Sequence, residues 1–141
     1  MKPPELESLD RYRTGLNMLL GMSAEKADLI SDQLASEAPE FVRLMVEFAF
    51  ADIFARRSLD LRARLFVAIG ALAAQGRTAN QLRYFVGCSL RSGCSREEVV
   101  EALMQVAVFA GFAAASDALE ACRDLLLDDQ QDCGCADAAA R

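Results

Sequence analysis

Two segments, residues 61–74 and 96–110, constrain the fold more than any other feature of the sequence. As helices, both would be apolar on most of their surface, and a chain of 141 residues cannot cover two such helices well by itself. The sequence therefore predicts an all-α subunit in an obligate homo-oligomer, and the alternative is that both helices lie inside a monomeric bundle. The apolar residues are Leu65, Phe66, Val67, Ile69 and Leu72 in the first segment, and Val99, Val100, Leu103, Met104, Val106, Val108 and Phe109 in the second.

Apolar periodicity and end signals predict a bundle of six to seven helices and no strands. Asp60 and Gly76 bound the helix over 61–74, since aspartate is a frequent N-cap and glycine a frequent stop. Capping boxes are predicted at Thr78 with Gln81 and at Ser95 with Glu98. The predicted helices cover residues 6–20, 24–34, 39–56, 61–74, 78–93, 96–110 and 113–127.

The amino-acid composition argues against nucleic acids and membranes as binding partners. The net charge of −6 excludes a nucleic-acid partner, because the chain has no basic run to neutralise phosphates. Basic residues are scattered, and the longest apolar stretch, Leu65 to Ala74, is too short to cross a bilayer, so we expect no membrane contact and a cytoplasmic location. We predict one helical domain over residues 1–127 and a flexible acidic, Ala-rich tail over residues 128–141.

Several separated motifs resemble one known family. Residues 47–56 (EFAFADIFAR), 59–61 (LDL) and Arg64 are similar to the central signature of carboxymuconolactone decarboxylases. Tyr12 and Gly15 match its N-terminal Tyr-x-x-Gly, and the match continues through Leu90, residues 93–99, Glu101 and residues 105–111. The resemblance covers roughly residues 10–127, with one extra residue in 77–82.

The resemblance implies a helical fold of the kind found in AhpD, assembled as a homotrimer or homohexamer. It implies decarboxylation of a small carboxylated lactone in aromatic catabolism, without a cofactor or a metal. The wider superfamily includes alkylhydroperoxidases, which use a Cys-x-x-Cys pair and a histidine.

The chain departs from that pattern at its reactive positions. Phe85 occupies the position of the family histidine, eight residues before Gly93, and the chain contains no histidine at all. Phe109 replaces a tyrosine and Ala113 a proline. No Cys-x-x-Cys occurs, so the peroxidase chemistry of the superfamily lacks its dithiol.

The remaining charged residues of the signature are the candidate site. Arg56 and Arg64 are predicted to bind a substrate carboxylate, since guanidinium groups match it in a two-pronged geometry. Glu47 or Asp52 is predicted to transfer a proton if burial raises its pKa. Structural alternatives are an ordinary ion pair between Asp52 and Arg56, and an Arg64 that closes the oligomer.

Aromatic and thiol residues complete the predicted site. Phe85 and Phe109 are expected to approach one another in an apolar cavity, with Gln105 also contacting the substrate. Cys88 lies one turn beyond Phe85 on the same helical face and is a third catalytic candidate, although a buried cysteine is often only a small hydrophobe. Cys133 and Cys135 on the tail could bind a soft metal or form a redox pair.

Three functions are compatible with these residues. The first is a cofactor-free relative of the decarboxylases that binds or transforms a small cyclic organic acid with altered chemistry. The second is a non-catalytic member that binds a ligand or scaffolds a partner. The third is a thiol-dependent, peroxidase-like oxidoreductase.

Overall fold

The structure is a computed structural model that describes residues 4–23, 30 and 32–127. Every regular element in this part of the chain is a helix, which confirms the all-α prediction. None of these helices has the length and apolar character that a bilayer crossing requires. The predicted tail over 128–141, with Cys133 and Cys135, lies outside the described residues.

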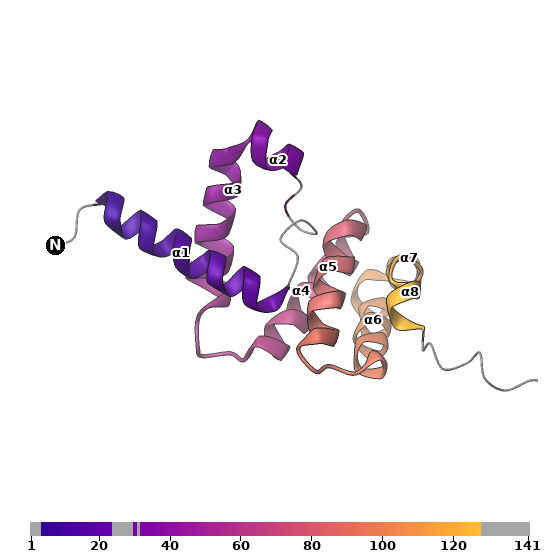
Figure 1. Cartoon of the computed structure of the whole chain (residues 1–141). Coiled ribbons are helices and arrows are strands. Elements are labelled where there is room, and N and C mark those ends of the chain that lie inside the picture. The colour runs from indigo at the N-terminus through magenta and orange to yellow at the C-terminus, as the bar shows by residue number, and fades with distance from the viewer. Residues whose placement is uncertain (1–3, 24–29, 31, 128–141) are drawn as a thin grey trace, which may run out of the picture.

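The first half of the chain forms one group of helices (Figure 1). Helix α1 (Pro4–Met22) packs against η2 (Val46–Phe54), which continues α3 (Pro39–Met45), and α2 (Asp32–Glu37) precedes α3. Their shared core includes Leu19, Val42 and Phe50 together with Leu65 of the next helix.

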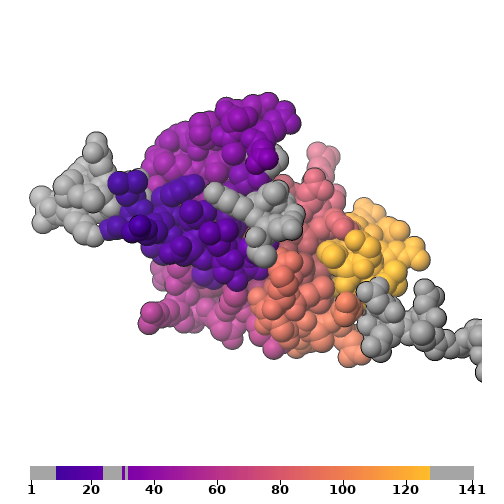
Figure 2. Space-filling view, viewed as in Figure 1, coloured from indigo at the N-terminus to yellow at the C-terminus, as the bar shows by residue number. Residues whose placement is uncertain are grey.

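The second half packs around a second core. It contains α4 (Leu61–Gln75), α5 (Ala79–Arg91), α6 (Arg96–Ala110), α7 (Phe112–Ala121) and α8 (Arg123–Leu126). Ile69, Val86 and Leu103 lie at the centre of this cluster. Figure 2 shows the α1 segment across one face of the molecule and the α7–α8 segment at the far end.

Local signals placed several helix ends correctly. The Asp60 carboxylate accepts a hydrogen bond from Ala63 N at 2.8 Å, and Gly76 ends α4 with a φ of 69°. Ser95 and Glu98 form the predicted capping box, with Glu98 N donating to Ser95 Oγ at 3.0 Å.

Four local predictions are wrong. Helix α1 continues through Gly21, and the second helix extends past residue 34 to Glu37, although residues 24–29 and 31 of its predicted range are outside the described residues. Thr78 forms no capping box, because its hydroxyl donates to Leu72 O at 2.9 Å instead. The last predicted helix, 113–127, is divided at Cys122 into α7 and α8.

The third predicted helix is continuous but changes its winding. From Val46 it is a π-helix, in which each hydrogen bond spans five residues, and Ala55 N donates to Phe50 O at 3.0 Å. A π-helix of nine residues is unusual, since most are single-turn bulges. It ends before Arg56, within two residues of the predicted end.

Helix α1 approaches η2 at Gly15. A Cβ on Gly15 would lie only 2.2 Å from Val46 O, so the two backbones touch where any larger residue would separate them. This contact explains physically why the Tyr-x-x-Gly motif needs its glycine.

We expect Gly15→Ala to lower the free energy of unfolding by about 1–3 kcal/mol, because the added methyl group forces α1 away from η2. Urea unfolding followed by circular dichroism measures the change. Gly21→Ala is the matched control in the same helix, since a Cβ there meets nothing within 4 Å. Equal effects of the two substitutions would contradict this account of Gly15.

Candidate functional site

Glu47 is a buried carboxylate held by two arginines from different helices. Its residue is 3% exposed. Arg43 Nη1 donates to Glu47 Oε1 at 2.9 Å, and Arg11 Nη1 lies 3.5 Å from Glu47 Oε2. Arg43 also donates to Glu40, through Nε at 2.9 Å, and Arg11 donates to Asp52, through Nε at 3.2 Å. One network therefore joins α1, α3 and η2.

The sequence offered an ion pair between Asp52 and Arg56 as a structural alternative. This pair does not form in the structure. The partner of Asp52 is Arg11, which is far away in sequence and is brought to η2 by the α1 contact. The hydrogen bond to Asp52 raises the pKa of the Arg11 guanidinium, and the hydrogen bond to Glu40 raises that of Arg43. Through Arg11, both Glu47 and Asp52 connect η2 to α1. Their role in proton transfer stays a prediction.

The two arginines predicted to bind substrate have different surroundings. Arg64 donates to Leu59 O at 3.1 Å and to Arg56 O at 3.0 Å, so it fixes the turn after η2. Arg56 is exposed, and no ion pair of its guanidinium appears among the described residues. Arg64 therefore holds the backbone that presents Arg56 to solvent.

Phe85 lies between the two cores of the subunit. It is half-buried on α5 and packs against both hydrophobic clusters. Its ring stacks on Phe54 with centroids 5.9 Å apart, and Tyr84 meets it edge-on at 5.1 Å. Phe54 is in turn 5.5 Å from Phe50, so an aromatic row runs from η2 to α5.

Phe85 and Phe109 do not meet within the described subunit, and their shared cavity stays a prediction. Phe109 is 83% exposed at the end of α6 and makes no ring contact with Phe85, while Gln105 is also exposed. Val108, the residue before Phe109, is also exposed at 70%. Phe109 and Gln105 therefore belong to the surface of the described subunit.

Cys88 lies in a small polar group, of which the sequence predicted only the cysteine. Its thiol is fully buried, and Arg91 Nη2 lies 3.5 Å from Cys88 Sγ. Arg91 Nε also donates to Met22 O at 3.4 Å, at the end of α1. The i,i+3 spacing of Cys88 and Arg91 on one helix was a signal that could have found this pair.

The Tyr84 hydroxyl belongs to the same group. Its residue is 4% exposed, and no group meets the geometry of a hydrogen bond with Oη. Burial raises the pKa of Tyr84, the neighbouring Cys88 raises it further, and the side chains of Arg91 and Ser23 lower it. Cys88 and Ser23 are therefore the polar neighbours of this hydroxyl.

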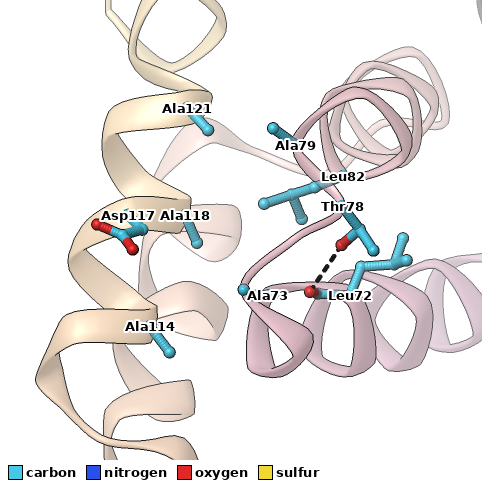
Figure 3. Close-up of a pocket in the computed structure, with 10 residues that line it drawn as sticks. Leu72, Ala73, Thr78, Ala79, Leu82, Ala114, Asp117, Ala118 and Ala121 are labelled. Atoms are coloured by element: carbon cyan, nitrogen blue, oxygen red, sulfur yellow. Dashed lines mark hydrogen bonds between the residues drawn. The ribbon is translucent and has the colours of Figure 1, made fainter.

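A separate cavity lies between α7 and the α4–α5 turn (Figure 3). Its volume is about 70 Å³, and none of the candidate residues lines it. Figure 3 shows mainly alanine and leucine side chains at its wall, with the Thr78 hydroxyl turned to the Leu72 carbonyl. Cavities that bury a small-molecule ligand are larger, about 300–1,000 Å³, so this one is a packing gap.

Metal binding has no support in the described part of the chain. Within residues 4–23, 30 and 32–127, no three His, Cys, Asp or Glu side chains converge on one point.

We expect Arg43→Met to lower the urea midpoint of unfolding more than Arg62→Met does. Arg43 binds a buried carboxylate, and its loss leaves Glu47 with one more distant cation. Arg62 pairs with Glu98 where both side chains are solvent-exposed, and such pairs contribute little. Equal midpoint changes would show that Glu47 is not held in the way described.

Comparison with known proteins agrees with these motifs. An uncharacterized 15.0 kDa protein from the nqo9-nqo10 intergenic region of Paracoccus denitrificans is 34% identical over 62% of this chain. The match covers 66% of that protein, so the chain spans just under two thirds of it. A 4-carboxymuconolactone decarboxylase of Acinetobacter baylyi is 24% identical over 84% of this chain and 88% of its own length.

The family model agrees with these relatives. It describes the carboxymuconolactone decarboxylase family and matches residues 39–124, from the start of α3 into α8. The matched region contains η2, the Phe54–Phe85 stack and both arginines predicted to bind substrate. The chain belongs to the carboxymuconolactone decarboxylase family.

Proposed function

We propose that this protein binds a small cyclic organic acid without a cofactor and has lost the histidine-dependent decarboxylation of its relatives. The observation that carries the proposal is the Phe54–Phe85 stack, with an exposed cation two residues beyond Phe54. Both rings are half-buried, so each offers part of an apolar face. A ring of the ligand packs on the phenyl groups, and its carboxylate binds Arg56.

The position of Arg64 supports this assignment. Arg64 binds the backbone carbonyl of Arg56, and this contact restrains the turn that carries the Arg56 side chain. A restrained base reduces the entropy lost when the guanidinium orders around a carboxylate. Arg64 is thus a positioning residue, and Arg56 is the residue that contacts the ligand.

We expect benzoate to bind more tightly than benzamide, which has the same ring without the charge. Arg56→Gln weakens benzoate binding by about tenfold and removes this preference, because a charge-assisted hydrogen bond contributes roughly 1.5–3 kcal/mol. Isothermal titration calorimetry measures both ligands.

Arg57→Gln is the control for this experiment. Arg57 is also exposed and adjacent in sequence, so the substitution removes the same charge from a position outside the proposed contact. Its affinity for benzoate is expected to match that of the wild type. Benzoate binding that is unaffected by Arg56→Gln would overturn the proposal.

The loss of decarboxylation follows from Phe85. A phenyl ring cannot accept or donate a proton, so the step that the family histidine is expected to assist has no general acid or base at this position. We expect no turnover of 4-carboxymuconolactone above background in an assay of product formation. Turnover comparable with that of a histidine-containing relative would contradict this, and Phe85→His tests whether a proton carrier restores any rate.

We also propose that the subunit assembles as a homotrimer or homohexamer. Large apolar side chains are exposed on α4, α6 and α7, with Phe109 83% and Phe112 86% exposed. Burying one such side chain contributes about 1.5–3 kcal/mol, and their number favours a second copy as the cover. The others on these three helices are Val67, Met104 and Val108.

Light scattering tests the assembly. We expect a mass that is a multiple of 15.3 kDa and a shift toward a single subunit in Phe109→Asp. Gln75→Asp adds the same charge at an exposed polar position and is expected to leave the assembly intact. A wild-type protein that is only a 15.3 kDa species at micromolar concentration would exclude the oligomer.

A further inference from the structure

The organic-acid site proposed at Arg56 is exposed to solvent in the single subunit. Arg56 is exposed, and the apolar residues three positions on either side of it, Ile53 and Leu59, are 40% and 43% exposed. The cavity in Figure 3 lies elsewhere, since none of these residues lines it. Sites for small ligands bury most of the ligand surface, so the described residues of one subunit leave this site without a cover.

Two phenyl groups at the corner between α6 and α7 are exposed in the opposite sense, as rings without a partner surface. Phe109 is 83% and Phe112 is 86% exposed, more than any other large apolar side chain of the described residues. Gly111 lies between them, and its positive φ of 89° ends α6 and begins α7. Neither ring belongs to a core cluster of the described residues. An aromatic pair exposed in this way indicates a contact with another molecule.

The exposed cation and the exposed phenyl groups lie at opposite ends of α4 and α6. Arg62 in the first turn of α4 donates to Glu98 in the first turn of α6 at 2.8 Å, so both helices begin at the same end. Arg56 lies at that end, because its carbonyl accepts a hydrogen bond from Arg64 Nη2 at 3.0 Å. Phe109 lies beyond Glu98 by about 16 Å along the α6 axis, at a rise of about 1.5 Å per residue. A subunit therefore does not cover its own Arg56 with its own Phe109.

We propose that a second copy of this chain completes the organic-acid site, with its Phe109 and Phe112 covering the Arg56 side of the first copy. The proposal rests on the proposed function of Arg56 and adds the residues that enclose the ligand. Each subunit has one cationic end and one aromatic end. Each copy therefore both receives a cover and supplies one, as a closed symmetric assembly requires.

The two ends are chemically complementary. A guanidinium stacks on the face of an aromatic ring, and the attraction is stronger where water is excluded. Ile53 and Leu59 offer aliphatic contacts to the remaining phenyl surface. The bound acid then lies between two copies, with its carboxylate on Arg56. Its ring lies between Phe54 and Phe85 of one copy and the phenyl pair of the other.

The surface between the two ends favours a second copy as the occupant. Val67 of α4 and Met104 and Val108 of α6 are exposed, and α4 packs against α6. The two phenyl groups alone offer about 300 Å², since an aromatic side chain buries about 150–250 Å². A stable interface takes about 800 Å² from each partner, so these side chains supply a large share of one.

Hybrid assemblies of two variants test the proposal on the full chain. Arg56→Gln lacks the cation and keeps both phenyl groups. The double variant Phe109→Leu with Phe112→Leu keeps the cation and an apolar surface for assembly but lacks the rings. Each variant by itself is expected to bind benzoate about tenfold more weakly than the wild type in isothermal titration calorimetry.

The two variants are then co-expressed with different affinity tags, and hybrids are purified through both tags. A hybrid unites an intact Arg56 of one copy with intact phenyl groups of another at roughly a quarter to a half of its sites. Those sites are expected to bind benzoate with wild-type affinity. A site contained in one subunit gains nothing from mixing, because every subunit of the hybrid has one defect.

Phe41→Leu is the matched control for loss of an exposed phenyl group. Phe41 is 57% exposed on α3, outside the proposed contact. The substitution is expected to change neither the affinity for benzoate nor the mass of the assembly in light scattering.

Several results would overturn the proposal while leaving the organic-acid site at Arg56 in place. These are hybrids without wild-type sites, unchanged affinity in the double phenyl variant, and two differently tagged wild-type chains that do not co-purify. In each case the loss of affinity in Arg56→Gln still supports the site itself. A wild-type protein that does not bind benzoate is a different outcome, because it refutes the proposed function and this inference with it.

Discussion

Helix α1 and the π-helix η2 touch backbone to backbone at Gly15 and Val46, and other features of the N-terminal half depend on this contact. It places Arg11 of α1 beside two carboxylates of η2, Glu47 and Asp52. Without it, Glu47 would have one arginine from its own helix and no connection to α1. The glycine and the ion-pair network therefore act together, the first by permitting the approach and the second by fixing its position.

Helix α5 contributes residues to both cores, and several of its side chains are reactive or ionisable. Tyr84 and Cys88 belong to the N-terminal cluster, while Leu82 and Val86 belong to the C-terminal one. Phe85 packs against both. Arg91 of this helix also reaches Cys88, with Nη2 3.5 Å from Sγ.

The five arginines discussed above fall into two groups: those that bind other helices or the backbone, and those without a carboxylate partner among the described residues. Arg11 and Arg43 bind carboxylates, and Arg64 binds backbone carbonyls, so these three stabilise the arrangement of helices. Arg56 is exposed after η2, and Arg91 lies on a thiol. Residue type alone could not make this division, because all of them are arginines, and Arg56 and Arg64 belong to the same family signature.

The sequence by itself determined the helical class, the family and the ends of α4 and α6, because ordered motifs and capping hydrogen bonds within a few residues carry that information. It failed at Thr78, whose hydroxyl reaches Leu72 across a turn. Only the tertiary structure decided that Asp52 pairs with Arg11 and that Phe109 is exposed on the subunit. The sequence also did not predict that η2 is wound as a π-helix. Those features depend on where separate helices meet, and helical periodicity gives the face of a helix but not its neighbour.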